Sequence, residues 1–236
     1  MTPEKQRAHD EARARARELA AEFDAKGDTL GWFDALYRES QGDIDLVPWA
    51  DLEPNRFFKG WADKNQLSAR GRDALVVGCG LGDDARFLHD LGFNVTAFDI
   101  SAAAIDWAKK LHEDTSIEFV AADLFDPPEA WLQAFDFVLE IYTIQPLPLE
   151  MRSRVIDSIA SFVKPSGELL VVCRGREDDE RPDQLPWPLS RRELSRFGEN
   201  GLEQGEFEEI WDEEDEQKRF IIRYRRPAAN AAGSDS

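Results

Sequence analysis

Apolar and polar residues alternate between residues 73 and 225 in a pattern that predicts short buried strands separated by amphipathic helices. Five apolar runs are typical of strands, at 73–77, 93–98, 117–121, 135–142 and 169–173. Apolar residues recur at helical spacing in 83–91, 101–111 and 149–163. A short helix is expected from Ser190, and two last strands, near 205–211 and 218–225, follow each other across an acidic turn and should form a hairpin.

Strands that alternate with helices indicate right-handed crossovers and a mostly parallel sheet. We therefore expect an α/β fold with a Rossmann-like, doubly wound, seven-stranded sheet that ends in a C-terminal β-hairpin. Residues 71–227 would form this core. Residues 1–70, a helix followed by an aromatic-rich stretch, would form an N-terminal helical and aromatic cover. Residues 228–236 are small and polar and are expected to be disordered.

Composition narrows the class of protein. The 236 residues are 42% hydrophobic, which suits a globular chain, and no apolar run approaches the roughly 18 residues of a membrane span. The N-terminus has no apolar signal core, so a cytoplasmic protein is expected. Two cysteines and three histidines share no metal-ligand spacing, so no metal is expected. The oligomeric state stays open.

Charge argues against one class of partner. The net charge is −19, and residues 177–216 hold 16 acidic against 4 basic residues. A field of this sign repels phosphate backbones, so nucleic acid is a poor candidate partner.

A glycine-rich turn follows the first strand, as Gly78-Cys79-Gly80-Leu81-Gly82. Glycines there let the backbone approach a ligand closely and adopt positive φ. The spacing G-x-G-x-G differs from the G-x-G-x-x-G of dinucleotide pyrophosphate sites. Cys79 is read as a small residue of this turn and not as a nucleophile.

Carboxylates follow the next two strands. Asp99 ends the second strand, where it suits hydrogen bonds to ribose hydroxyls, and Asp123 ends the third, where it could accept a bond from an exocyclic amine. Each alone is more often a cap or a turn residue, but three such features on consecutive strands indicate a nucleoside-bearing ligand. Asp83 and Asp84 after the turn would repel a pyrophosphate and favour an ammonium and a sulfonium, which points from NAD to S-adenosylmethionine.

These residues resemble the class I S-adenosylmethionine-dependent methyltransferases, from about Trp32 to Pro227. The resemblance is carried by VVGCGLGDDARFLHDLGFNVTAFDISAAAIDWA, VAADLF, FDFVLEIYTI and FVKPSGELLVV. Within the class, Trp32 and Tyr37 before VPW, FDFVLEIYTIQPLPLEMR and DQLPWPLSRREL are similar to the small-molecule branch that includes the thiopurine and thiocyanate/halide methyltransferases. Ile141 departs from the thiopurine pattern, so the resemblance does not select thiopurines as acceptors.

The resemblance implies S-adenosylmethionine as cofactor and a role for each matching residue. The turn of Gly78, Cys79 and Gly80, which ends at Gly82, would lie beside the methionyl part of the cofactor. Asp99 would hold the ribose, and Ile100 would face the adenine. Asp123 and Leu124 would contact adenine, and Glu140 would lie near the methionyl amine or the substrate. Trp32, Tyr37 and Trp49 would cover the site, with Trp32 among the cofactor-binding residues and Tyr37 and Trp49 near the acceptor, and Trp187 could close the other side.

Methyl transfer from a sulfonium mainly requires alignment and exclusion of water, so a general base is optional. Glu140 and, more weakly, Tyr142 are the candidate catalytic residues, and a purely cofactor-orienting role for Glu140 is at least as plausible. The predicted function is methyl transfer to a small-molecule acceptor with an S, O or N nucleophile. Two alternatives stay open: a non-catalytic cofactor-binding or regulatory module, and an NAD(P)-dependent oxidoreductase.

Overall fold

The computed structural model describes residues 3–182 and 185–229 of the chain, so most of the tail expected at 228–236 lies outside the described residues. Its strands are β1 (Asp73–Val77), β2 (Asn94–Asp99), β3 (Glu118–Ala121), β4 (Phe135–Ile141), β5 (Val163–Arg176), β6 (Leu189–Ser190), β7 (Glu203–Asp212) and β8 (Gln217–Arg225). Its α-helices are α1 (Pro3–Asp24), α2 (Gly31–Ser40), α3 (Arg56–Lys64), α4 (Asp83–Asp90), α5 (Ala102–Leu111), α6 (Arg152–Ser161), α7 (Arg191–Leu194) and α8 (Arg196–Glu199).

The sheet has the order β3-β2-β1-β4-β5-β8-β7, with all pairs from β3 to β5 parallel. β8 runs antiparallel to both β5 and β7, which confirms the predicted hairpin. The order reverses between β1 and β4, and in such sheets ligands bind outside the carboxyl ends of the strands at this switch. The sheet thus brings the ends of β1, β2, β3 and β4 to one edge.

Two apolar layers cover the sheet. On one face, Leu88 of α4 and Ile105 of α5 pack with Val76 and Phe137. On the other face, Ile156 and Ile159 of α6 and Phe197 of α8 pack with Leu75 and Val138. Phe58 and Trp61 of α3 are buried in the first of these layers, with Phe57 packed against it.

Strands β5 and β6 extend the sheet beyond the expected pattern. β5 begins at Val163, not at Leu169, because Val163 already pairs with Phe135 before the register shifts by way of residues 164–167. A Cβ at Gly167 would lie 2.8 Å from the carbonyl oxygen of Phe135, so this shift depends on glycine. β6 is an eighth strand of two residues that pairs with the end of β5.

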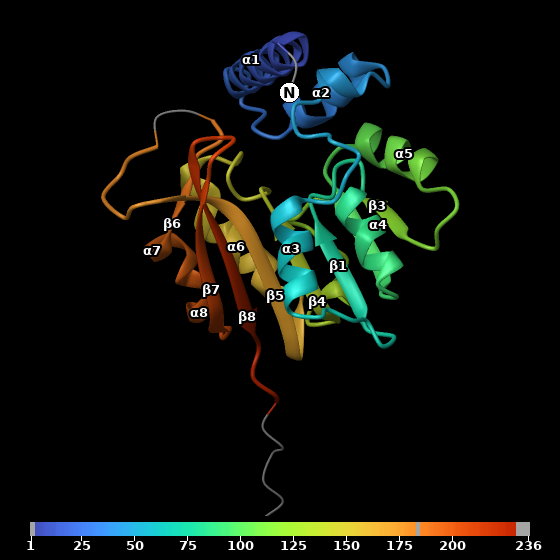
Figure 1. Ribbon diagram of the computed structural model, residues 1–236, viewed down its shortest axis with the longest axis vertical. Coiled ribbons are helices and arrows are strands. Elements are labelled where there is room, and N and C mark those ends of the chain that lie inside the picture. Colours follow the sequence, from blue (N-terminus) through green and yellow to red (C-terminus); the bar gives the residue numbers. More distant parts are fainter. Residues whose placement is uncertain (1–2, 183–184, 230–236) are drawn as a thin grey trace, which may run out of the picture.

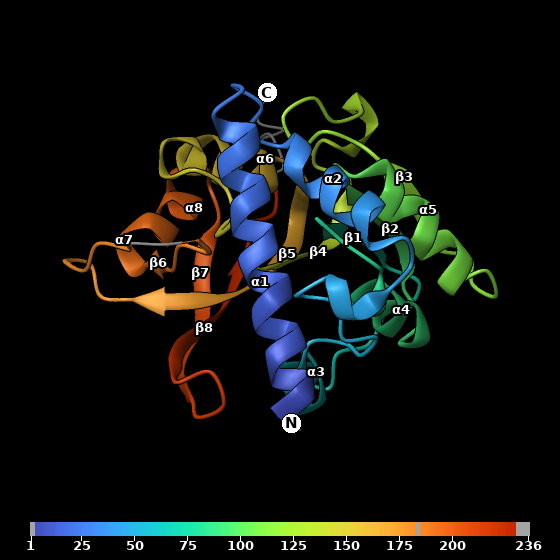
Figure 2. The same ribbon diagram turned by 90° about the horizontal axis from the view of Figure 1, so that it is seen from above.

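The first two helices lie over the carboxyl edge of the sheet. Figure 1 shows α1 and α2 together above this edge, and Figure 2 shows α1 crossing over it. Between them, Ala16 and Leu19 of α1 pack with Trp32 and Leu36 of α2 in a small separate core. None of the helices in the described ranges is long and apolar enough to cross a membrane.

Candidate active site

The glycine turn after β1 takes the backbone form that the sequence predicts. Gly78, Gly80 and Gly82 have φ of +60°, +52° and +90°. A Cβ at Gly78 would lie 2.5 Å from Oγ1 of Thr143, and one at Gly82 would lie 2.7 Å from the ring of Phe119. These positions therefore exclude any side chain, which keeps the turn tight where β1 meets α4.

Asp99 connects the glycine turn to the end of β2. Its carboxylate accepts hydrogen bonds from the N–H of Gly80 and the N–H of Ser101, both at 2.9 Å, and the residue is 8% exposed. Burial raises the pKa of Asp99, while these backbone N–H groups act in the opposite direction. A carboxylate has about four acceptor sites, so the two oxygens retain capacity for the hydroxyls of a ribose.

The ends of β2 and β3 are joined beside Asp99. The N–H of Ala122 donates to the carbonyl of Asp99 at 3.0 Å. Ile100 leaves 39% of its surface exposed, although it is a large apolar residue, whereas Leu124 is buried. Asp123 accepts the N–H of Phe125 at 2.8 Å, so one of its oxygens shapes the turn. Ile100 thus offers an apolar surface next to two carboxylates.

Glu140 is fully buried at the end of β4. Its Oε1 accepts the N–H groups of Thr143 and Ile144 at 2.7 and 3.0 Å, and its Oε2 has no partner among the described residues. Burial raises the pKa of Glu140 to about 7. The side chain holds the loop after β4 in place.

Tyr142 follows β4 with φ of +59°, a conformation that costs energy for a bulky residue. Its N–H donates to the carbonyl of Val172 at 3.1 Å, and its ring lies 5.6 Å from the guanidinium of Arg219. Burial raises the pKa of Tyr142, while Arg219, the Asn55 side chain and Arg174 oppose this effect. The ring therefore lies at the carboxyl edge between α3 and the hairpin.

The three aromatic residues of the expected cover differ in position. Tyr37 is buried, its hydroxyl accepts the Trp49 indole N–H at 2.7 Å, and the same oxygen lies 3.0 Å from the Cβ position of Gly80. Trp49 is 41% exposed. Trp32 stacks on Phe33 at 3.9 Å and is buried in the core between α1 and α2. Tyr37 thus lies against the glycine turn, Trp49 bonds to its hydroxyl, and the ring of Trp32 packs edge-on to that of Trp49.

Trp187 lies in the loop before β6. Its N–H donates to the carbonyl of Gln145 at 2.9 Å, and its carbonyl accepts from Arg152 at 2.6 Å. These bonds join its loop to the loop after β4, on the β5 side of the candidate site.

Acidic residues open α4 directly after the glycine turn. Burial, together with the charge of Asp51, raises the pKa of Asp83 to about 6. Burial raises the pKa of Asp84 to about 7, although its carboxylate accepts the N–H of Asn55 at 2.8 Å. Both groups would gain from a cationic neighbour, as the sequence analysis expects for an ammonium-bearing ligand.

Three residues that the sequence analysis did not single out contribute to the site. Asp34 of α2 accepts from the Ser101 hydroxyl at 2.8 Å and from the Ala103 N–H at 3.0 Å. Thr143 donates to the carbonyl of Val77 at 2.9 Å beneath Gly78. Asn55 caps α3 and contacts Asp84. Only Asn55 gave a signal, because it follows Pro54 ahead of an apolar helical stretch.

Both cysteines are free, as expected, with Cys79 in the turn and Cys173 buried in β5. Among the described residues, no group of three or more His, Cys, Asp or Glu side chains is arranged to hold a metal ion.

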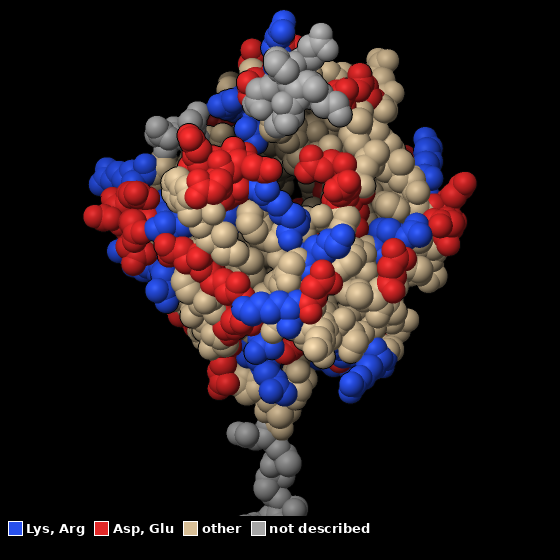
Figure 3. Space-filling model, in the orientation of Figure 1, with Lys and Arg blue, Asp and Glu red and all other residues tan. Residues whose placement is uncertain are grey.

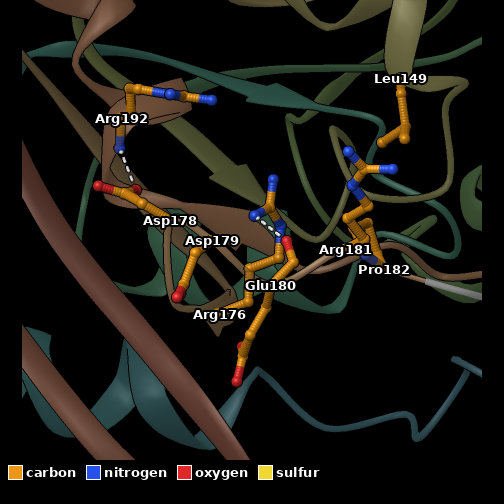
Figure 4. A pocket seen from close by; sticks show the side chains of 8 residues that line it. All are labelled: Leu149, Arg176, Asp178, Asp179, Glu180, Arg181, Pro182 and Arg192. Atoms are coloured by element: carbon orange, nitrogen blue, oxygen red, sulfur yellow. Dashed lines mark hydrogen bonds between the residues drawn. The ribbon is translucent and has the colours of Figure 1, made fainter.

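The surface of the molecule has a hollow near the carboxyl edge of the sheet (Figure 3) and another in the loop after β5. Figure 3 shows a hollow above α3, between two groups of acidic side chains. A separate polar hollow of about 490 Å³ lies in the loop after β5, lined by Leu149, Arg176, Asp178, Asp179, Glu180, Arg181, Pro182 and Arg192 (Figure 4). The guanidinium of Arg176 there already donates to Glu177, Glu180 and Glu193, so this hollow is held together by its own polar groups.

The chain was compared with known families and structures. Residues 74–167 match the sequence model of the family described as methyltransferase domain. No curated protein matches the chain significantly in sequence. The match covers β1 to the start of β5, which is the segment that carries the glycine turn, Asp99, Asp123 and Glu140.

Solved structures share the fold at low sequence identity. The N-methyltransferase NodS from Bradyrhizobium japonicum WM9, in complex with S-adenosyl-L-homocysteine, is 19% identical with a TM-score of 0.63, over 82% of this chain and 97% of that one. The 1,6-didemethyltoxoflavin-N1-methyltransferase of Burkholderia thailandensis is 15% identical with a TM-score of 0.63, over 83% and 85%. The [4+2]-cyclase SpnF is 18% identical with a TM-score of 0.63, over 74% and 81%.

The family match falls within the segment that carries the shared fold. Residues 74–167 match a methyltransferase domain, and the chain shares the fold of solved methyltransferases such as NodS and the Burkholderia thailandensis enzyme.

Proposed function

We propose that this chain transfers the methyl group of S-adenosylmethionine to a small-molecule acceptor with a sulfur, oxygen or nitrogen nucleophile. The observation that carries the proposal is the pairing of Asp99 with the glycine turn. The Asp99 carboxylate accepts the Gly80 N–H at 2.9 Å, and exposed Ile100 follows it directly. This arrangement sets a ribose-binding carboxylate, an apolar surface for a base and a close-approach backbone side by side.

Each predicted residue has a role in this proposal. Asp99 binds the ribose, with Ile100, Asp123 and Leu124 at the adenine, while Gly78, Cys79, Gly80 and Gly82 admit the methionyl chain. Asp83 and Asp84 face its ammonium group. We also propose that residues 1–70 act as a cover over a core of residues 71–227, since Tyr37 of this segment lies against the turn and Trp49 donates to its hydroxyl.

The bound cofactor supplies a methyl group that is already activated by the sulfonium. The chain must therefore align the acceptor with this carbon and exclude water, and such positioning is worth about 7–11 kcal/mol. Tyr37, Trp49 and the α1–α2 pair exclude water from above. Tyr142 orients the acceptor from the edge where its ring lies beside Arg219. Burial raises the pKa of Tyr142, so its hydroxyl stays protonated at neutral pH and Tyr142 is the weaker candidate base. Glu140 stays the alternative base.

Two structural neighbours support a small-molecule acceptor. The Burkholderia thailandensis enzyme was solved with 1,6-didemethyltoxoflavin, and NodS is named as an N-methyltransferase. The net charge of −19 disfavours a nucleic acid acceptor on electrostatic grounds.

Calorimetric titration with S-adenosylhomocysteine, with NADH as the control ligand, tests the cofactor site. We expect micromolar binding of the first and none of the second. Asp99→Ala should weaken S-adenosylhomocysteine binding by about tenfold or more, since bonds to a charged group are strong. Asp73→Asn, at the amino end of β1, is the matched control and should leave the affinity unchanged.

Unchanged affinity in a folded Asp99→Ala variant would contradict the ribose assignment. Tight binding of NADH would favour an oxidoreductase. Binding of S-adenosylhomocysteine without turnover of any thiol, phenol, amine or halide acceptor would favour a non-catalytic module.

A further inference from the structure

Arg174, near the carboxyl end of β5, has a guanidinium group without a hydrogen bond among the described residues. Its nearest acidic atom is Oδ2 of Asp215, at 3.7 Å, and its side chain is 19% exposed. Arg176, two residues further along, instead donates through Nε, Nη1 and Nη2 to four different residues. The planar donor fork of Arg174 is therefore available to another molecule.

This fork lies beside the proposed acceptor position. Tyr142, directly after β4, bonds through its N–H to the carbonyl of Val172, two residues before Arg174. The backbone N–H of Arg174 donates to Oε1 of Gln145 at 2.9 Å, which holds the loop after β4 against it. Arg174 and Tyr142 thus occupy neighbouring strand ends at the edge where the methyl acceptor would lie.

A second arginine faces Arg174 across the β5–β8 pair. Arg174 and Arg219 are register partners, and the Arg219 guanidinium lies 5.6 Å from the ring of Tyr142. Arg219 is almost fully buried, and two carboxylates balance its positive charge. Its guanidinium donates to Asp212 at 3.1 Å and also to Asp215. Arg174 shares Asp215 with Arg13 and Arg219, at 3.7 Å and without a side-chain hydrogen bond, so its charge is less closely balanced than that of Arg219.

The fold balances this charge only through Asp215. Burial lowers the pKa of Arg174 and the charges of Arg219 and Arg13 lower it further, while Asp215 acts in the opposite direction. A half-buried guanidinium next to like charges costs stability unless an anion neutralises it. Functional groups commonly carry such a cost.

A carboxylate is the anion that fits best. Two parallel N–H donors of a guanidinium match the two oxygens of a carboxylate. A phosphate dianion would be opposed more strongly by Asp215 and Glu214 in the same hairpin turn and by the net charge of −19.

We propose that Arg174 binds a carboxylate group of the methyl acceptor and so sets the substrate class, with Tyr142 beside the nucleophile. This inference rests on the proposed methyltransferase function. It makes the site bipolar, with Asp83 and Asp84 on the side of the cofactor ammonium and Arg174 on the side of the acceptor anion.

The test uses the full chain saturated with S-adenosylhomocysteine and titrated with benzoate and with benzamide, two probes of similar shape that differ in charge. We expect benzoate to bind about tenfold more tightly or better, as a charge-assisted pair requires. Arg174→Gln should abolish this preference and Arg174→Lys should reduce it. Arg225→Gln, which removes an exposed arginine from the far end of β8, should keep it.

Turnover supplies a second readout. Mercapto-, hydroxy- and aminobenzoates should yield more S-adenosylhomocysteine from S-adenosylmethionine than the matching benzamides, and Arg174→Gln should raise KM for the acids with little change for the amides. The same variant should melt at the wild-type temperature or above, because it removes a repelled charge.

The outcomes separate the two proposals. Failure of the wild-type chain to bind S-adenosylhomocysteine overturns the proposed function. Normal binding of S-adenosylhomocysteine with no preference for benzoate, or with a preference that Arg174→Gln keeps, overturns the carboxylate assignment alone. A large loss of stability in Arg174→Gln would make Arg174 a structural residue and would also overturn it.

Discussion

Glu140 holds the loop after β4 from a fully buried position. Its Oε1 accepts the N–H groups of Thr143 and Ile144, while its Oε2 lacks a partner among the described residues. With its pKa raised by burial to about 7, the carboxyl group is partly protonated at neutral pH. The geometry supports a role in shaping the loop after β4, and a role as general base stays a prediction.

Replacement of Glu140 by glutamine should change how stability depends on pH. In the wild-type chain the pKa rises from 4.5 unfolded to about 7 folded, so the folded state holds a proton that the unfolded state has lost. Stability therefore falls as pH rises from about 4.5 to about 7, by about 3 kcal/mol, and levels off above. Glu140→Gln removes this loss, which urea unfolding at pH 5, 6, 7 and 8 would measure.

The exposed Glu150→Gln substitution is the control and should follow the wild-type curve. Parallel curves for Glu140→Gln and wild type would show that Glu140 titrates normally in the fold. Activity separates the two roles of Glu140, because a base predicts loss of turnover in Glu140→Gln with S-adenosylhomocysteine binding intact.

For single residues, the sequence predicts where in the fold a side chain lies better than it predicts the hydrogen bonds that the side chain makes. Asp99 could be placed at a sheet edge because the apolar run of β2 stops there. Its bond to the Gly80 N–H follows from the parallel pairing of β1 with β2, which a single strand pattern does not encode. Arg174 gave no signal, because its meaning lies in the hydrogen bonds that its side chain lacks.

At the scale of elements, α2 is fastened to the start of α5 by one side chain. Asp34 accepts hydrogen bonds from the Ser101 hydroxyl and the Ala103 N–H. Ser101 lies two residues after Asp99 in the sequence. Burial would raise the pKa of Asp34, but the Ala103 N–H, Arg38 and Ser101 together hold it below its ordinary value. The helix that carries Tyr37 is thus positioned by the same segment that follows the proposed ribose carboxylate.

Asp34→Ala should therefore loosen the α2 cover. We expect a loss of about 1–2 kcal/mol in the free energy of unfolding, the usual cost of removing a cap at a helix N-terminus. Hydrogen exchange should increase in α2, and urea titration would measure the loss. Asp34→Asn keeps an acceptor oxygen and should lose less.

The control is Asp63→Ala, an exposed position on α3. Equal exchange in α2 of the Asp34→Ala and wild-type chains would mean that the apolar contacts of Trp32 and Leu36 hold the helix without Asp34.

The sequence predicts the central strands of the sheet better than it predicts the early start of β5 or the short strand β6. β1 matches its apolar run of residues 73–77, since a buried parallel strand needs nothing but apolar side chains. The apolar run of 169–173 places the start of the fifth strand at Leu169, but β5 already begins at Val163, which pairs with Phe135. β6 has only two residues and forms by pairing with the end of β5, so no local sequence pattern predicts it.

At the scale of the whole molecule, part of the acidic stretch of the sequence forms ion pairs that connect distant segments. The acidic turn between β7 and β8 pairs with arginines from distant segments. Asp215 contacts Arg13 of α1, Arg174 of β5 and Arg219 of β8, and Glu214 contacts Arg56 of α3. Part of the acidic stretch therefore joins the cover, the sheet and the hairpin.

Asp212 is the buried member of this network and gives its sharpest test. Its carboxylate pairs with Arg56 and Arg219, which hold its pKa below the ordinary value although burial alone would raise it. The side chains of Asp212 and Arg219 are each 3% exposed, so loss of one charge leaves the other buried and unbalanced. Breaking such a pair usually costs about 3–5 kcal/mol, and we expect Asp212→Asn to lower the free energy of unfolding by about 3 kcal/mol.

Removing both partners should cost less than removing one. An Asp212→Asn, Arg219→Met chain leaves no unpaired buried charge, so its stability should exceed that of Asp212→Asn. Urea unfolding of the two single variants and the double variant gives the coupling energy directly. Additive losses would show that Asp212 and Arg219 act independently, and the hairpin would then be held to the sheet by the apolar packing of Phe207 and Phe220 instead of by this ion pair.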